Sequence, residues 1–255
     1  MAQEDWAGLA HPASGAPQVI GSAAAGCLRG AHSLAAADAG YQVLRPSRNR
    51  GWGHPSTVQF VRRLAERAGE EGITGLLIGD MGQPRGGPMP SGHASHQNGL
   101  DVDIWFRLSF SRLSPAELEK PAPLNMVRGT AVDPASWGPR QARLVELAAR
   151  TPEVERIFVN PAIKQAMCRN APAQDRDWLR KLRPWWGHDE HFHVRLACPA
   201  DSPECEVQKP MPDGDGCGAE LESWLTKPTS PAPPSRPHVQ SRPLPESCVA
   251  VLREK

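Results

Sequence analysis

Two short segments in which apolar and polar residues alternate constrain the fold of this chain most strongly. They read His-Phe-His-Val-Arg-Leu at 191–196 and Leu-Asp-Val-Asp-Ile-Trp-Phe at 100–106. Alternation with a period of two is typical of a half-buried β-strand, because successive side chains point to opposite faces. Each segment is therefore predicted to be a strand whose polar face is turned away from the core. The polar residues that would share these faces are His191, His193 and Arg195 on one strand, and Asp101 and Asp103 on the other.

Histidines are concentrated next to these two strands. Five of the nine in the chain lie at positions 93, 96, 188, 191 and 193. A catalytic zinc ion usually takes three protein ligands from His, Asp and Glu and keeps a fourth position for water. A loop histidine, a strand carboxylate and a strand histidine supply such a set, so we expect His96, Asp103 and His193 to hold a metal. A single His or Asp is more often a hydrogen-bonding residue, but two dense clusters on two strand patterns favour a metal site.

Length and charge bound what the chain can be. Its 255 residues suffice for one large domain or two small ones with a buried core. A net charge of +1 gives no electrostatic case for a nucleic-acid partner or an anionic membrane. No apolar run approaches the length of a membrane span. The first residues, Met-Ala-Gln-Glu-Asp-Trp, do not form a signal peptide, as expected for a form from which a signal has been removed.

The six cysteines favour disulfides in an oxidising compartment. None forms a Cys-x-x-Cys pair, and they are even in number and widely scattered, at positions 27, 168, 198, 205, 217 and 248. Six cysteines allow fifteen pairings, so spacing alone does not fix the connectivity, although Cys198 and Cys205 could close a short loop. The alternative is a set of six reduced, buried thiols in a cytosolic protein.

The C-terminal region changes in composition. Residues 227–245 are rich in proline and are predicted to be extended, without regular structure. An apolar stretch, 248–252, follows. A free tail has no need of such an ending, so we predict that Cys248 ties the 227–247 tail to the body of the protein. The alternative is a flexible linker from which a further module was removed.

The remaining pattern indicates an α+β fold in a single domain over residues 1–255. The expected architecture is a central antiparallel sheet that carries the metal site, flanked by helices and long loops, because strands and helices alternate without regular βαβ repetition. A helix is expected from Pro55 to just before Gly72, with a capping box formed by Ser56 and Gln59. Further helices are expected at 114–120, 139–150 and 161–167, and short strands at 76–78 and 157–159.

The sequence excludes several common hydrolytic sites. It contains no His-Glu-x-x-His helix, no Ser-x-x-Lys with Lys-Thr-Gly, and no Gly-x-Ser-x-Gly. A metal-activated water is therefore the best-supported nucleophile. Arg85, in a Gly/Pro-rich loop, is a candidate to meet a substrate carboxylate, with an exposed loop arginine as the alternative. Trp185 and Trp186 could line a groove or pack in the core.

Three segments carry a resemblance to a known family. They are SGHASHQNGLDVDIWF, IFVNPAIKQAMC and WWGHDEHFHVRLACP, with the spacings His-x6-Asp and His-x2-His-x-His. Together they resemble the penicillin-insensitive murein endopeptidases, which belong to a wider group of zinc peptidases. The resemblance covers roughly residues 27 to 252, nearly the whole chain.

The resemblance implies a set of functional properties. It implies one Zn²⁺ per chain held by His96, Asp103 and His193, and an active site lined by His188 and His191. It implies a periplasmic enzyme that hydrolyses the D-alanyl–meso-diaminopimelyl cross-link of peptidoglycan. It also implies three disulfides, Cys27–Cys248, Cys168–Cys217 and Cys198–Cys205, the first of which agrees with the prediction for the tail.

The catalytic roles are assigned as hypotheses. His191, on the strand face of His193, is the expected general base. His188 is expected to donate a proton to the leaving amine or a hydrogen bond to the oxyanion. Glu190 occupies the position of a carboxylate base in related zinc peptidases, but on a regular strand it faces away from His191 and ranks second.

Three further residues keep alternative roles. His93 could face the substrate, bind a second metal ion or hydrogen-bond its loop. Asp101 could orient a ligand histidine or be solvated, and Arg195 could bind substrate or pair with an acid. Two other functions remain as alternatives: a zinc D,D- or L,D-carboxypeptidase on the same scaffold, and a non-catalytic zinc or cell-wall binding protein. Oligomeric state does not follow from the sequence.

Overall fold

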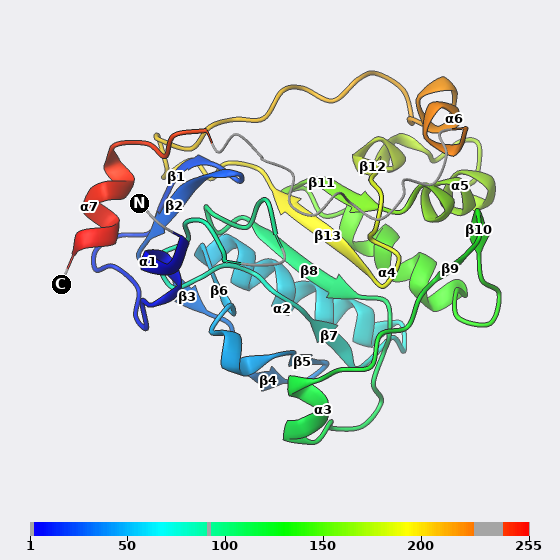
Figure 1. Cartoon of the computed structure of the whole chain (residues 1–255). Helices are drawn as coiled ribbons and strands as arrows, with labels where there is room; N and C mark the ends of the chain where they lie inside the picture. Colours follow the sequence, from blue (N-terminus) through cyan, green and yellow to red (C-terminus); the bar gives the residue numbers. More distant parts are fainter. Residues whose placement is uncertain (1–2, 91–92, 227–241, 255) are drawn as a thin grey trace.

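A seven-stranded sheet forms the centre of the protein (Figure 1). The computed structural model describes residues 3–90, 93–226 and 242–254. In spatial order, the strands are β12 (Leu182–Pro184), β11 (Val154–Val159), β13 (His191–Leu196), β8 (Asp101–Trp105), β7 (Leu76–Ile78), β5 (Tyr41–Val43) and β4 (Ala37–Asp38).

The sheet is mixed, which corrects the expectation of an antiparallel one. The four central strands, β11, β13, β8 and β7, are antiparallel to their neighbours in this group. The pairs β11–β12 and β5–β7 are parallel. The reason is that α5 (Pro161–Asn170) and α2 (Pro55–Glu70) lie in the connections between the paired strands, and such crossovers return the chain in the same direction. The prediction was right for the four central strands, which include those of the proposed metal ligands, and for the pair β4–β5, and wrong for the two parallel pairs.

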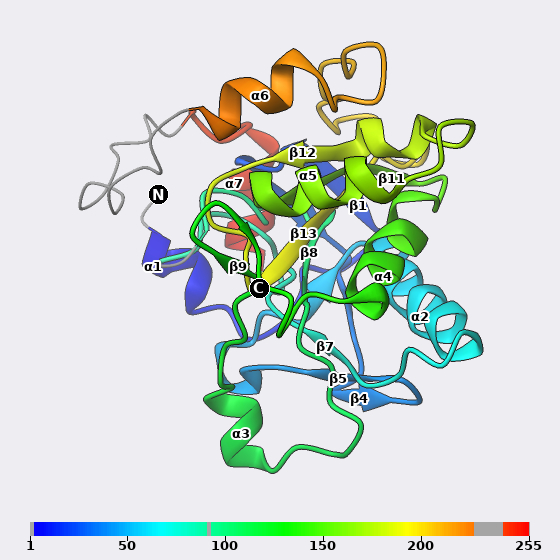
Figure 2. The same ribbon diagram turned by 90° about the vertical axis from the view of Figure 1, so that its right-hand side faces the viewer.

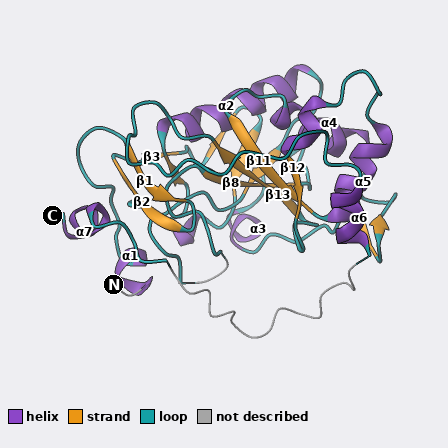
Figure 3. Ribbon diagram, turned by 90° about the horizontal axis from the view of Figure 1, so that it is seen from above, coloured by secondary structure: helices purple, strands orange, loops and turns teal. Residues whose placement is uncertain are grey.

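Helices cover one face of the sheet. Helix α2 and helix α4 (Pro139–Ala149) run along the same side of β8, β11 and β13 (Figure 3). The apolar alternating residues of β8 and β13 point into the resulting core, where Phe192 and Val194 are fully buried. The polar alternating residues therefore lie on the opposite face, as the pattern predicted.

Smaller elements complete the fold. The N-terminal part contains α1 (Gln3–Ala7), the hairpin of β1 (Gln18–Ser22) and β2 (Ala25–Arg29), the pair of β3 (His32–Ser33) and β6 (Trp52–Gly53), and the 3₁₀ turn Pro46–Arg48. The later elements are α3 (Pro115–Glu119), the pair of β9 (Val127–Arg128) and β10 (Ala131–Val132), the 3₁₀ turn Asp177–Lys181, α6 (Ala219–Leu225) and α7 (Ser247–Arg253). Figure 2 shows α6 above β12 and α5.

The start of α2 differs in its cap from the prediction. The Nδ1 atom of His54 accepts a hydrogen bond from the backbone N–H of Ser56 at 3.3 Å, so His54 is the N-cap. Pro55 occupies the first helical position, which places Ser56 inside the first turn. The predicted capping box of Ser56 and Gln59 is therefore wrong, whereas the corresponding box of Ser114 and Glu117 caps α3.

All three implied disulfides are present: Cys27–Cys248, Cys168–Cys217 and Cys198–Cys205. The first joins β2 to α7, and both of its cysteines are fully buried. Most of the proline-rich segment predicted to be extended, residues 227–241, lies outside the described residues. No described helix is long and apolar enough to cross a membrane.

Arg85 has a structural position that neither sequence interpretation anticipated. It is 7 % exposed, so it is not a surface loop arginine. Its guanidinium donates to the carbonyls of Val251 at 2.9 Å and Glu254 at 2.6 Å, and to that of His11 at 3.1 Å. Cationic donors of this kind stabilise the free carbonyls at a helix C-terminus, so Arg85 fastens α7 to its own loop.

Loss of the Cys27–Cys248 disulfide should be costly because it closes the longest loop. Its sequence separation is 221 residues, against 7 for Cys198–Cys205. The chain-entropy relation gives about 5 kcal/mol for the long loop and about 2.5 kcal/mol for the short one. Urea unfolding of Cys27→Ala/Cys248→Ala and Cys198→Ala/Cys205→Ala, both without reductant, should show this order. Equal losses would contradict it.

Candidate metal centre and active site

The pairing of β8 with β13 brings the polar residues of both strands onto one face. His193 lies opposite Asp103, and Arg195 lies opposite Asp101. This face is not solvated, since Asp101 is 0 % and Asp103 is 4 % exposed. The chain that connects β7 to β8 covers this face. The backbone N–H of Asp103 donates to the backbone carbonyl of Asp80, and the backbone N–H of His96 donates to the carboxylate of Asp101. The polar strand face is therefore a buried site.

His96 enters this site from the covering loop with its ring orientation fixed. Its φ of 66° is in the left-handed region, which costs a non-glycine residue free energy unless other contacts hold it. Two contacts do so here. Its N–H donates to Oδ2 of Asp101 at 2.9 Å, and its Nδ1 lies 2.6 Å from the carbonyl oxygen of Met81. When Nδ1 carries the proton and donates it in a hydrogen bond to that carbonyl, the lone pair of Nε2 is free to bind a metal.

One carboxylate oxygen of Asp103 lies at the centre of the histidines. Its Oδ1 is 3.4 Å from Nε2 of His96, 3.4 Å from Nδ1 of His193 and 3.7 Å from Nε2 of His191. Residues from the loop and from both strands thus converge on one point. The convergence includes all three residues expected to bind zinc.

Three buried polar atoms in this cluster have no hydrogen-bond partner among the residues that the structure describes: Nε2 of His96, Oδ1 of Asp103 and Nε2 of His193. Leaving a buried donor or acceptor unpaired typically costs about 1–3 kcal/mol. Nitrogen from imidazole and oxygen from carboxylate are the donors that zinc accepts in catalytic sites. The unpaired Nε2 of His96 and Oδ1 of Asp103, together with Nδ1 of His193 at 3.4 Å from that oxygen, therefore fit a bound zinc ion.

Two overlapping groups of metal-ligating atoms occur among the described residues. One consists of His93, His96 and Asp103, and the other of His96, Asp101 and His193. The expected ligand set spans both groups. Asp103 is the better carboxylate ligand, because both oxygens of Asp101 already have partners, whereas Oδ1 of Asp103 has none.

Burial and the neighbouring charges shift the pKa values of the clustered residues in different directions. Burial raises the pKa of Asp103, but the neighbouring His96 and His191 hold it well below its usual value. Burial lowers the pKa of His96, yet Asp103 outweighs it and raises the pKa to about 9. For His193 burial dominates and lowers the pKa to about 4. A metal cation here would replace the proton that Asp103 holds on His96, whereas His193 is already neutral, the form in which imidazole binds a metal.

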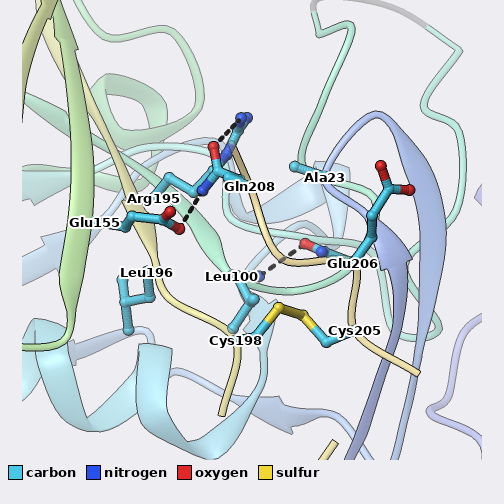
Figure 4. Close-up of a pocket in the computed structure, with 10 residues that line it drawn as sticks. Ala23, Leu100, Glu155, Arg195, Leu196, Cys198, Cys205, Glu206 and Gln208 are labelled. Atoms are coloured by element: carbon cyan, nitrogen blue, oxygen red, sulfur yellow. Dashed lines mark hydrogen bonds between the residues drawn. A yellow bond between two sulfur atoms is a disulfide. The ribbon is translucent and has the colours of Figure 1, made fainter. Parts of the chain in front are cut away.

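Asp101 connects the two sides of the cluster. It forms a bidentate pair with Arg195, at 2.6 Å to Nε and 3.0 Å to Nη2. Its Oδ1 also lies 3.3 Å from Nε2 of His193. Asp101 is thus placed to orient His193 and the loop of His96, and Arg195 pairs with an acid. Figure 4 shows Arg195 beside Gln208 and the Cys198–Cys205 disulfide, which line a small adjoining cavity.

Asp80 is a site residue that sequence reasoning missed. It is 4 % exposed and lies 2.9 Å from Nη1 of Arg50 and 3.0 Å from Nη1 of Arg48. Nε2 of His93 is 3.0 Å from Asp80 and 3.7 Å from Asp103. Hydrogen bonding within its loop is therefore the observed contact of His93. The sequence did contain one indication of this role. Asp80 comes two residues after the end of β7, and β7 is the strand that pairs with β8.

The residues assigned to catalysis lie around the open side of the cluster. The His191 side chain is 27 % exposed. The ring of His188 is centred 5.1 Å from that of His191, and burial together with His191 lowers the pKa of His188 to about 3. Glu190 precedes β13, belongs to neither group of metal-ligating atoms, and acts electrostatically on Arg45.

Comparison with known proteins identifies the family of this chain. The family model for "Penicillin-insensitive murein endopeptidase" matches residues 19–253. A protein of that name from Yersinia enterocolitica is 50 % identical over 99 % of this chain and 91 % of its own length. One from Salmonella paratyphi B is 49 % identical over 100 % of this chain and 93 % of its own length. The chain therefore belongs to the penicillin-insensitive murein endopeptidase family of hydrolases.

Proposed function

We propose that this protein is a zinc endopeptidase that hydrolyses D-alanyl–meso-diaminopimelyl cross-links of peptidoglycan in the periplasm. The observation that carries the proposal is the buried convergence of His96, His193 and the unpartnered Oδ1 of Asp103. The names of the relatives support murein as the substrate. The three disulfides support an oxidising compartment such as the periplasm.

His96, Asp103 and His193 would hold the zinc ion in this mechanism. When bound, zinc supplies a Lewis acid for the scissile carbonyl and lowers the pKa of a water toward about 7. His191 accepts the proton of the attacking water, because its Nε2 lies 3.7 Å from the carboxylate that faces the metal position. The Asp101 carboxylate orients His193 and is itself held by Arg195.

His188 assists from the loop before β13. Its left-handed φ of 50° and the contact of its Nδ1 with the carbonyl of Trp186, at 3.3 Å, fix the ring. Asn160 holds the same loop, since its side chain donates to Gly187 at 3.2 Å and its backbone N–H to His188 at 3.1 Å. From this position His188 is proposed to donate a proton to the leaving amine or a hydrogen bond to the oxyanion. Because the pKa of His188 is lowered to about 3, it gains the proton for this only as the negative charge of the oxyanion develops beside it.

Product analysis tests the proposal and separates it from its alternatives. Zinc-loaded protein should split purified dimeric muropeptides into monomers, identified by mass spectrometry. A chelator should stop the reaction and added zinc should restore it, while penicillin should not inhibit. Release of only a terminal amino acid would indicate a carboxypeptidase. Intact dimer after incubation with protein that contains one zinc per chain would indicate a binding protein.

A further inference from the structure

A row of aromatic rings leads from the candidate site to the protein surface. The Phe158 ring is centred 5.3 Å from the His193 ring and 5.9 Å from Trp185. Trp224 lies 5.9 Å from Trp185 and 6.0 Å from Trp186. Trp185 is 53 % exposed, which is unusual for so large an apolar side chain. We call Trp185, Trp186 and Trp224 the tryptophan platform.

The part of the platform that comes from the sheet is held in place by the backbone. Trp185 follows β12 directly, and its N–H donates to the carbonyl of Val159 at 2.8 Å. The carbonyl of Trp186 contacts Nδ1 of His188 at 3.3 Å. These two tryptophans therefore belong to the same rigid segment as the catalytic candidates. Any ligand on their faces would be in a fixed position relative to His188.

The part that comes from α6 is tethered independently. The Cys168–Cys217 disulfide joins α5 to the segment just before α6, and Glu220 in the first turn of α6 pairs with Arg183 of β12. Nζ of the buried Lys164 donates to the carbonyl of Asp215 at 2.6 Å. These contacts keep Trp224 beside Trp185 and Trp186, at the end of the sheet where α6 lies over β12 (Figure 2).

We propose that the tryptophan platform binds sugar rings of the glycan strand that carries the stem peptide. Trp185 is exposed and Trp186 and Trp224 are partly buried, and aromatic side chains held in place at the surface mark interaction sites. A pyranose ring has an apolar C–H face, which stacks on an aromatic ring, and polar edges, which stay in water. The proposal rests on the proposed function, because it assumes that the peptide being cleaved is part of peptidoglycan.

The dimensions agree with this assignment. Three ring-to-ring steps of 5.3, 5.9 and 5.9 Å separate His193 from Trp224. An extended stem of four residues spans at most roughly 13–14 Å. Trp185 lies only the first two of these steps from His193, within the span of the stem. A sugar attached to the far end of a stem peptide whose scissile bond lies at His193 therefore reaches Trp185, and the next sugar of the strand continues toward Trp224.

The test compares two substrates that differ only in their sugars. Cross-linked peptide dimers are prepared with the disaccharides attached and, after enzymatic removal, without them. For Trp224→Ala, the ratio of kcat/KM with sugar to kcat/KM without sugar should fall roughly 3- to 10-fold, mainly through KM. Trp224→Phe should recover most of that ratio. Phe110→Ala is the control, since Phe110 is 66 % exposed and lies near Tyr41, at the other end of the sheet.

Several outcomes overturn the proposal. An equal loss on both substrates would mean that Trp224 contacts the peptide or supports the site, and no loss on either would mean that it binds no part of the substrate. Binding of peptide-free glycan strands to the zinc-loaded protein, followed by tryptophan fluorescence, tests the platform without turnover. If the wild-type protein does not bind these strands, the sugar-binding proposal is wrong but the proposed function stands. If the wild-type protein cleaves neither dimer, the proposed function is wrong.

Discussion

Replacing His191 with alanine is expected to lower kcat on dimeric muropeptides by roughly two to four orders of magnitude. The imidazole is the proposed proton acceptor, and alanine removes it without touching His96, Asp103 or His193. Zinc content should therefore stay near one ion per chain. Stopped assays with metal analysis on the same samples measure both quantities.

Two comparisons make this result specific. His32→Ala, at an exposed histidine on β3, should keep wild-type turnover. Glu190→Gln should lower turnover less than His191→Ala, because Glu190 lies outside the group of atoms that converge on Asp103. Near-normal turnover in His191→Ala, or a larger loss in Glu190→Gln, would transfer the role of general base away from His191.

Replacing Asp101 with asparagine is expected to weaken both folding and metal binding. The neutral side chain leaves the partly buried Arg195 without its bidentate partner, and breaking a pair of this kind, here with a fully buried carboxylate, typically costs about 3–5 kcal/mol. It also removes the carboxylate beside His193, and losses of this kind lower metal affinity roughly 10- to 100-fold. Urea unfolding of the metal-free protein and zinc competition titrations separate the two effects.

A second variant distinguishes the two causes. Asp101→Asn/Arg195→Gln removes the unpaired charge and should recover much of the lost stability, but zinc affinity should remain low. Asp175→Asn is the surface control, because its pair with Arg150 is exposed and should change stability by about 1 kcal/mol or less. Zinc affinity equal to wild type in Asp101→Asn would show that Asp101 does not orient a ligand.

The strands at the site could be predicted from the sequence because each carries its own alternating pattern. The segments 100–106 and 191–196 were assigned to the correct faces, and β8 and β13 have nearly those bounds. Their adjacency could not follow from either pattern, since some ninety residues separate them. The resemblance to a family supplied that link, together with the pairing of the six cysteines.

Other features depend on contacts that no local pattern contains. Asp80 looks like an ordinary residue after a strand, yet Arg48, Arg50 and His93 surround it in the fold. Arg85 looks like a surface residue, yet it is buried under α7. The parallel strands were missed for the same reason, because direction is set by where a crossover helix packs rather than by the strand itself.

The Arg85 contacts and the Cys27–Cys248 disulfide tie the chain that leads into the metal site to the last described helix. The chain from Gly86 to Gln97, which carries His93 and His96, directly follows Arg85, whose guanidinium donates hydrogen bonds to carbonyls at the end of α7. Residues 248–254 are synthesised after every strand of the sheet. A chain without these residues therefore lacks the contacts of Arg85 with α7 that hold the start of the loop. Segments far apart along the chain thus share one support, and the order of the ligand loop depends on contacts made by the last described helix.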